Sequence, residues 1–152
     1  MPRRPIRLAT RAIILVNDEL LMVNAWPQNR TESENDLWCA PGGGADPHHS
    51  LPENLAREVH EETGLTVTVG APCMVNEFHA PERSFHQVDI YFRCTVISGQ
   101  LSEDWQDPEH IVTRRKFFSR DALKQIRFKP DSLPDVAWGD GFAYDPLEPL
   151  VR

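Results

Sequence analysis

Cysteine is scarce in this sequence, and its three cysteines lie far apart. Cys39, Cys73 and Cys94 form no C-x-x-C pair among 152 residues. Disulfide scaffolds and thiolate zinc sites need more cysteines at closer spacing. The composition therefore argues against both and predicts three free thiols in a reducing, cytoplasmic setting.

Long apolar runs and excess positive charge are also missing. The apolar run from Ala12 to Val16 is too short for the core of a signal peptide, and no stretch approaches the length of a membrane span. Acidic residues number 23 against 16 basic ones, for a formal net charge of -7. An acidic surface repels the backbone of nucleic acids, so we expect neither a nucleic-acid nor a membrane partner.

Several catalytic motifs are absent. No G-x-S-x-G segment supports a serine hydrolase. His60-Glu61 begins like the zinc motif H-E-x-x-H, but Gly64 stands where the second histidine is needed. The run Gly42-Gly43-Gly44 matches neither the dinucleotide-binding fingerprint nor a P-loop.

The patterns that are present predict one mixed α/β (α+β) domain over residues 1–152. Strands are expected before and after one long helix, with a second helix near the end. The expected strands are Arg7–Val16, Leu20–Ala25, Trp38–Ala40, Leu65–Val75, Val88–Val96 and Thr113–Phe118, the helices Ser50–Thr63 and Ser119–Ile126, and the loops Pro27–Asp36 and Pro81–Arg83.

Proline concentrates near the end of the sequence. Pro130, Pro134, Pro146 and Pro149 are expected to break any regular element there. We predict a proline-rich C-terminal arm from about 129, either ordered over the body or partly loose. Such an arm could contact another protein or build a homodimer interface.

The long helix has clear ends and an unusual concentration of acid. Ser50 and Glu53 form an S-x-x-E capping box, and Gly64 follows as a C-terminal stop. Glu58, Glu61 and Glu62 stand at i, i+3 and i+4, so we expect them on one face, opposite the leucines. Such carboxylates repel, and a hard cation such as Mg²⁺ would relieve the repulsion. The alternative is a solvated acidic helix face.

The segment from Gly43 to Leu65 resembles the Nudix box, the signature of the Nudix hydrolase family. Trp38-x-x-Pro41-Gly42-Gly43 also resembles the usual lead-in. The resemblance implies a mixed β-sheet sandwiched between helices and hydrolysis of phosphoric anhydride bonds with Mg²⁺ or Mn²⁺. The residues that fall on the pattern are Gly43, Arg57, Glu58, Val59, Glu61, Glu62, Gly64 and Leu65.

His49 departs from the pattern, which has glutamate six residues after Gly43. In the family that carboxylate supports the helix arginine and the metal region. The change therefore predicts weaker metal binding or a slower reaction. It also leaves open a domain that binds a nucleotide without cutting it.

The resemblance also assigns roles. Glu58 and Glu62 would hold the metal, Glu61 would assist, the Gly43 carbonyl would add a ligand, and Arg57 would orient the glutamates. Glu109 is the candidate catalytic carboxylate outside the box, with Glu103 behind it, although a solvated loop is the plainer interpretation of both.

Residues after the box suggest a substrate. Aromatic side chains that could stack on a nucleobase are Trp26, Phe78, Phe85 and Tyr91, and Arg83 and His86 could reach a phosphate. The alternative is ordinary packing or exposure. Pro81 lies 16 residues past Leu65 and resembles a mark of ADP-ribose hydrolases. We expect a nucleoside diphosphate linked to another moiety, such as ADP-ribose or a nucleotide sugar, with a nucleoside triphosphate as the alternative.

Overall fold

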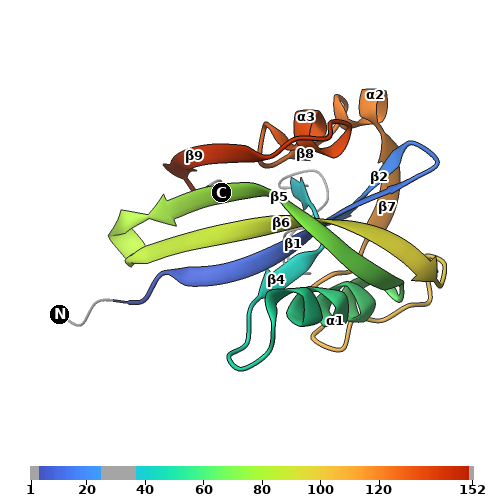
Figure 1. Ribbon diagram of the computed structural model, residues 1–152, viewed down its shortest axis with the longest axis horizontal. Coiled ribbons are helices and arrows are strands. Elements are labelled where there is room, and N and C mark those ends of the chain that lie inside the picture. Colours follow the sequence, from blue (N-terminus) through green and yellow to red (C-terminus); the bar gives the residue numbers. More distant parts are fainter. Residues whose placement is uncertain (1–3, 25–36, 151–152) are drawn as a thin grey trace.

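The computed structural model describes residues 4–24 and 37–150 (Figure 1). The expected loop Pro27–Asp36 and Trp26 lie outside the described residues. The strands are β1 (Arg7–Val16), β2 (Glu19–Asn24), β3 (Leu37–Cys39), β4 (Gly42–Gly44), β5 (Thr66–Ala80), β6 (Phe85–Ser98), β7 (Arg115–Ser119), β8 (Arg127–Phe128) and β9 (Ala143–Pro149). The helices are α1 (Leu51–Thr63), α2 (Arg120–Leu123) and α3 (Leu133–Ala137), with a 3-10 turn, η1 (Pro81–Arg83).

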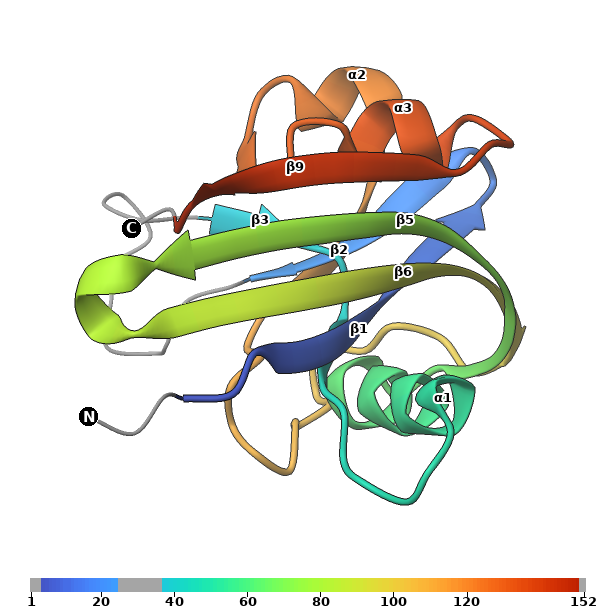
Figure 2. The same ribbon diagram turned by 60° about the vertical axis from the view of Figure 1, so that its left-hand side comes forward.

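The strands form one mixed sheet in the order β8-β3-β2-β1-β6-β5-β9, with β4 paired to β1 and β7 paired to β2. β1 runs parallel to β6, whereas β5 and β6 form a long antiparallel hairpin closed by η1. α1 lies on one side of the sheet, and α2 and α3 lie on the other (Figure 2). The predicted α+β fold, a mixed sheet between helices, is confirmed.

The first hairpin follows directly from its turn residues. Asn17 and Asp18 adopt positive φ values of 51° and 65°. Two consecutive residues of this kind give the turn whose twist matches that of paired strands. Val16 then pairs with Glu19, and the predicted hairpin is confirmed.

Both predicted ends of the long helix are confirmed, but its predicted faces are wrong. The Ser50 hydroxyl accepts a hydrogen bond from the Glu53 N–H at 3.1 Å, and Gly64 ends α1 in the left-handed conformation with φ 77°. Glu58 and Glu62 are buried on the same side as Leu55 rather than opposite it. The side of α1 that faces the sheet thus buries the carboxylates of Glu58 and Glu62, because polar groups described below lie close to them.

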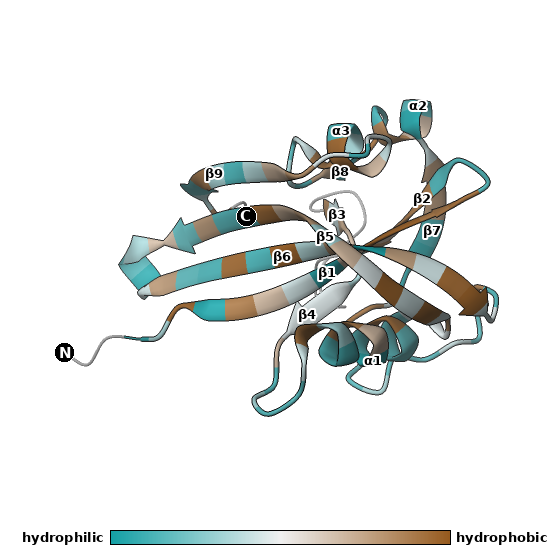
Figure 3. Cartoon of the chain, viewed as in Figure 1, coloured by the Kyte–Doolittle hydropathy of each residue, from teal (hydrophilic) through white to brown (hydrophobic). Residues whose placement is uncertain are grey.

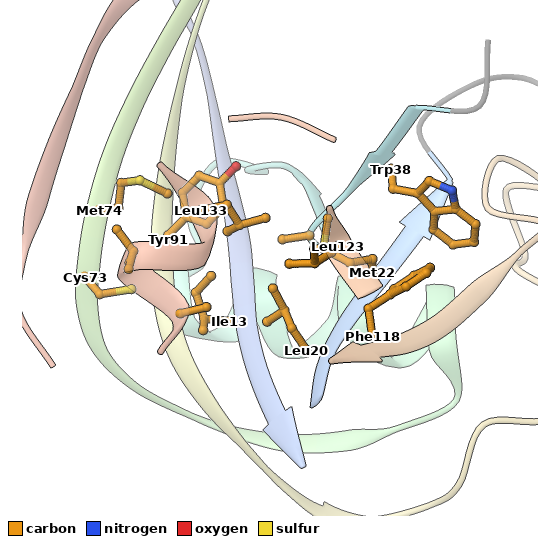
Figure 4. Packing of buried hydrophobic residues seen from close by; sticks show 13 residues of the cluster. Ile13, Leu20, Met22, Trp38, Cys73, Met74, Tyr91, Phe118, Leu123 and Leu133 are labelled. Atoms are coloured by element: carbon orange, nitrogen blue, oxygen red, sulfur yellow. The ribbon is translucent and has the colours of Figure 1, made fainter. Parts of the chain in front are cut away.

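Apolar side chains fill both sides of the sheet, and hydrophobic and hydrophilic residues alternate along β5 and β6 (Figure 3). One cluster lies between α1 and the sheet and includes Ile14, Leu55 and Val59. The other lies beneath α2 and α3, where Leu133 packs near Tyr91 (Figure 4). The strands are therefore held from both faces, and residues that alternate along one strand serve different sides.

The prolines after Lys129 do not prevent regular structure, so that prediction is wrong. Pro134 lies in the first turn of α3, where a missing N–H costs little. Pro146 lies in β9, an edge strand that pairs in parallel with β5 and leaves its other side unpaired within the described sheet. The arm therefore extends the sheet by one strand (Figure 2). In the described parts of the chain, no helix is long and apolar enough to cross a bilayer.

Candidate active site

The glycine run is fixed against β1 by strand pairing. Thr10 pairs with Gly43, and Arg11 pairs with Gly42. Gly42 has φ 152°, and a Cβ there would lie 2.0 Å from the Thr10 carbonyl oxygen. Only glycine fits this close approach of two backbones. The Gly42 N–H donates to the Glu62 carboxylate at 3.1 Å, so the turn holds the end of α1.

Glu62 is a buried acid with a strongly altered affinity for protons. It is 7% exposed. Burial raises the pKa of Glu62 from its ordinary value of 4.5 to about 8, against the opposing effects of Arg11 and the Gly42 N–H. The charges of Glu58 and Asp107 contribute to this raised pKa. The metal-free protein therefore holds a proton on Glu62 at neutral pH.

Glu58 lies directly beside the glycine run. A Cβ on Gly43 would come within 2.9 Å of the Glu58 carboxylate, so the missing side chain of Gly43 leaves room for that group. Burial raises the pKa of Glu58, and the charges of Glu109 and Glu61 add to the effect of burial, while Arg57 opposes it. The structure thus brings Glu58, Glu61 and Glu109 within electrostatic range of one another.

Arg57 is shared among three carboxylates. Its NH1 lies 3.5 Å from Glu58 Oε1 and 3.3 Å from Glu61 Oε1, and its NH2 lies 2.8 Å from Asp46 Oδ2. Asp46 was not singled out from the sequence. It sits in the loop before the helix, where no periodic pattern marks a residue as facing inward.

The loop that carries Glu109 is tied down by Asp107. The buried Asp107 carboxylate accepts hydrogen bonds from the backbone N–H groups of Glu109, Ile111 and Val112 at 2.9 to 3.2 Å. Glu103 is exposed in the same loop.

The same loop and the start of β7 are joined to the C-terminal end of α1. The Trp105 indole N–H donates to the Glu61 carbonyl at 2.8 Å, and the Arg115 Nε donates to the Glu62 carbonyl at 2.7 Å. These bonds occupy carbonyls that the helix leaves without intrahelical partners. The loop and the helix therefore hold Glu109 and the box glutamates in one fixed region.

The donors of this region suit a hard divalent cation in kind. Glu58, Glu61, Glu62 and the Gly43 carbonyl offer only oxygen, and a cation would favour the charged form of the two buried carboxylates. Among the described residues, no three His, Cys, Asp or Glu side chains converge closely enough to hold an ion as they stand. Arg57 engages Glu61, and Gly42 engages Glu62, so the cation would have to compete with these partners.

A cavity of about 340 Å³ opens on the face of β1 away from α1. The parallel register sets Arg7 beside Gln87, and Arg7 NH1 donates to Gln87 Oε1 at 2.5 Å. The Gln87 amide donates to Asp89 at 2.7 Å, and Arg11 Nε lies 3.4 Å from the other Asp89 oxygen. The floor of the cavity is therefore a chain of charge-assisted contacts.

Two of the three residues predicted to bind substrate border this cavity. Phe78 and Arg83 are among its lining residues. His86 is not one of them, and its Nε2 lies 3.1 Å from Glu77 Oε1. Glu77 also accepts a hydrogen bond from the Tyr144 hydroxyl of β9. The structure thus separates His86 from Phe78 and Arg83.

Arg11 connects the cavity with the glutamate helix, and sequence reasoning missed it. It borders the cavity, and its NH1 donates to the carbonyls of Ala40 at 3.2 Å and Gly42 at 3.3 Å. Burial works against its charge, but Asp89 and other neighbours outweigh burial and raise the pKa of Arg11. The available signal was a charged residue inside an apolar strand, since such residues are usually paired or functional.

A model of the NUDIX domain matches residues 5–138. The chain belongs to the NUDIX family. The Nudix resemblance of the segment from Gly43 to Leu65 is thereby confirmed. NUDIX hydrolases generally use divalent metal ions and act on small nucleotide substrates.

Related proteins support the NUDIX assignment. Diphosphoinositol polyphosphate phosphohydrolase 2 of Rattus norvegicus is 30% identical over 111 residues, which are 72% of this chain and 55% of that protein. The matched part of the chain spans about half the length of these curated relatives, 55% of the rat protein and 51% of a relative from Bacillus subtilis.

Solved NUDIX structures share the fold. A UDP-X diphosphatase aligns with a TM-score of 0.70 at 21% identity, over 95% of this chain and 70% of that one. An ADP-ribose pyrophosphatase from Streptococcus suis aligns with a TM-score of 0.64 at 22% identity, over 93% of this chain and 100% of that one. At such identities the likeness concerns the fold and not the substrate.

Proposed function

We propose that this protein is a metal-dependent pyrophosphohydrolase for a nucleoside diphosphate linked to another moiety, with ADP-ribose or a nucleotide sugar as the preferred substrate. One observation carries the proposal. Arg11 and Gly42 join a helix of buried carboxylates to a cavity lined by cationic and aromatic side chains. A diphosphate held between the two would meet metal ligands on one side and a binding cavity on the other.

In the proposed reaction, Glu58, Glu61, Glu62 and the Gly43 carbonyl would hold Mg²⁺ or Mn²⁺, which would supply Lewis-acid activation of the phosphoryl oxygens and of water. Arg57 orients Glu58 and Glu61 through its charge-assisted contacts.

Glu109 is the proposed proton acceptor. A water attacks one phosphorus, the bridging P–O bond breaks, and two phosphate esters leave while Glu109 takes up the proton. The Trp105 indole N–H donates to the Glu61 carbonyl and keeps this loop close to α1, while backbone N–H groups of the loop donate to Asp107.

The cavity favours a nucleotide over a polyphosphate that has no aromatic base. Phe78 and Phe85 line it with ring centroids 6.0 Å apart and planes inclined by 36°. Aromatic faces bind nucleobases by stacking. Arg7 and Arg83 add positive charge that suits phosphate. A volume of about 340 Å³ lies in the usual range for small-ligand pockets.

The test is a substrate panel with Mg²⁺ or Mn²⁺. ADP-ribose, a nucleotide sugar, a nucleoside triphosphate and a diphosphoinositol polyphosphate are each incubated with the full chain, and the released phosphate species are identified. We expect ADP-ribose or the nucleotide sugar to be cleaved fastest, and EDTA to abolish cleavage. Glu62→Gln is expected to lower turnover by at least about 100-fold, since it removes a charged metal ligand. Glu19→Gln, at the exposed first hairpin, is the matched control and should be unaffected.

Other outcomes would redirect the proposal. Fastest cleavage of the nucleoside triphosphate would favour the triphosphate alternative. Fastest cleavage of the diphosphoinositol polyphosphate would favour the substrate class named for the rat relative. Nucleotide binding without turnover of any compound would exclude hydrolysis and favour a binding-only domain.

A further inference from the structure

Position 49 contributes no carboxylate to the region of Arg57. His49 Nδ1 lies 3.8 Å from Glu53 Oε2, and both side chains are largely exposed, at 63% and 70%. This contact belongs to the first turn of α1. The helix arginine therefore has to find its anionic support elsewhere.

Asp46 supplies a carboxylate at this point. Its Oδ2 lies 2.8 Å from Arg57 NH2, which is shorter than the contacts of Arg57 with Glu58 at 3.5 Å and Glu61 at 3.3 Å. A short, charge-assisted contact of this kind is stronger than the longer ones beside it.

The Asp46 side chain is 63% exposed, but its backbone is fixed by a buried side chain, which places the carboxylate beside Arg57. Asn54 is 1% exposed. Its Oδ1 accepts the Asp46 N–H at 3.0 Å, and its Nδ2 donates to the carbonyls of Asp46 at 3.3 Å and Ser50 at 3.0 Å. Asn54 Oδ1 also accepts from Arg57 NH2 at 3.3 Å. The Asn54 amide thus connects the loop of Asp46, the start of α1 and the Arg57 guanidinium.

The contacts with Asp46 and Asn54 determine which nitrogen of the Arg57 guanidinium faces Glu58 and Glu61. Asp46 and Asn54 occupy NH2, so only NH1 reaches Glu58 and Glu61, at 3.3 Å or more. A guanidinium is a rigid planar fork that grips a carboxylate best with two nitrogens. Without Asp46, the fork could turn and bind Glu58 or Glu61 with both arms, in direct competition with a cation.

We propose that Asp46 is the positioning residue of Arg57, which keeps Glu58 and Glu61 available to a divalent cation and does the work that the family pattern assigns to position 49. The proposal rests on the proposed metal site. It does not depend on which substrate the site cleaves.

The experiment measures Mn²⁺ binding to the full chain without substrate, by calorimetry and electron paramagnetic resonance. Asp46→Asn should raise the Kd for Mn²⁺ by about 10-fold, as is usual when a partner of a metal ligand is lost. Asp46→Glu keeps the charge and should stay within about threefold of the wild type. Asp135→Asn removes an equally short, exposed contact with Arg120, at 2.6 Å, away from the site and should change nothing.

Position 49 offers a second, independent variant. If Asp46 already fills the role, His49→Glu should leave the Kd within about threefold of the wild type. A tightening of about 10-fold or more would overturn the proposal, because it would show that the role is unfilled.

Failure of this proposal differs from failure of the proposed function. An unchanged Kd in Asp46→Asn, or equal losses in Asp46→Asn and Asp46→Glu, would overturn the positioning role even in an active enzyme. If the Mn²⁺ affinity of the wild type depends on Asp46 as proposed but no compound is cleaved, hydrolysis alone is overturned. A wild type that binds no Mn²⁺ would overturn both.

Discussion

The two sides of the Gly42 turn carry opposite charge. On the α1 side, Glu58 and Glu62 are buried, and burial raises the pKa of both. On the cavity side, Arg7 and Arg11 lie over a floor of Gln87 and Asp89. The first side buries acidic groups that lack full compensation, whereas the second pairs its charges internally.

The difference explains why one side would need an added ion and the other would not. Asp89 is buried with Arg11 Nε 3.4 Å from its carboxylate, whereas the pKa of Glu62 is raised by burial despite the opposing charge of Arg11. A buried carboxylate without full compensation takes up a proton or a cation. The cavity could accept a ligand as it is, whereas the proposed metal would complete the glutamate helix.

We expect the largest loss of stability from a substitution at Gly42, where the two sides join. Gly42→Ala would put a methyl group 2.0 Å from the Thr10 carbonyl oxygen, so β4 would have to leave β1. We expect a loss of about 4 kcal/mol or more in the free energy of unfolding, measured by urea titration. Gly141→Ala is the matched control, because no described residue apart from its chain neighbours lies within 4 Å of its Cβ position. Equal stability of the two variants would contradict the close approach.

Arg11→Met tests whether one cation serves both sides. It would leave the buried Asp89 carboxylate without its ion pair and remove a positive neighbour from Glu62. We expect a loss of about 3 kcal/mol, typical of breaking a buried pair from one side. The double variant Arg11→Met/Asp89→Asn should recover part of the loss. Additive losses in the double variant would show that the two residues are not coupled.

The stability of the metal-free protein should fall as pH rises, and Glu62 should be a main cause. Its folded-state pKa, about 8, lies above its ordinary value of 4.5. Between these values the folded state holds a proton that the unfolded state has lost, so raising the pH favours unfolding. Between pH 5 and 8 in EDTA, we expect the wild type to lose on the order of 1–3 kcal/mol relative to Glu62→Gln, by urea unfolding.

Added Mn²⁺ should reverse the trend. The cation competes with the proton on Glu62, so stabilisation of the wild type by Mn²⁺ should grow from pH 6 to pH 8. Glu62→Gln should show much weaker stabilisation at either pH. Parallel pH profiles for the wild type and Glu62→Gln in EDTA would refute the raised pKa.

The smallest effect is expected at the rim of the cavity. Arg83 is exposed on η1 and borders the cavity. Arg83→Ala should raise KM by about fivefold with kcat nearly unchanged, because the lost contact serves ground state and transition state alike. Arg120→Ala, an exposed arginine on α2, is the control. A fall in kcat with unchanged KM would move Arg83 from binding to chemistry.

Local signals were enough for much of the fold. The turn Asn17-Asp18, the capping residue Ser50 and the stop at Gly64 each act within a few residues, and all three have the predicted effect. The structure of the proline-rich C-terminal arm did not follow from local signals. Whether Pro146 is tolerated depends on β9 being an edge strand, and strand order is not a local property.

By itself, the sequence determined the box: the spacing from Gly43 to Arg57, Glu58 and Glu62 on the capped helix that follows identifies the family. Only the tertiary structure decided which charges compensate one another. Arg11 and Asp89 are 78 positions apart in the sequence and meet because β1 runs beside β6. Asp46 meets Arg57 because Asn54 folds the loop back onto the helix. Helix periodicity is set by the backbone, whereas pairing across strands and loops depends on how the whole chain packs.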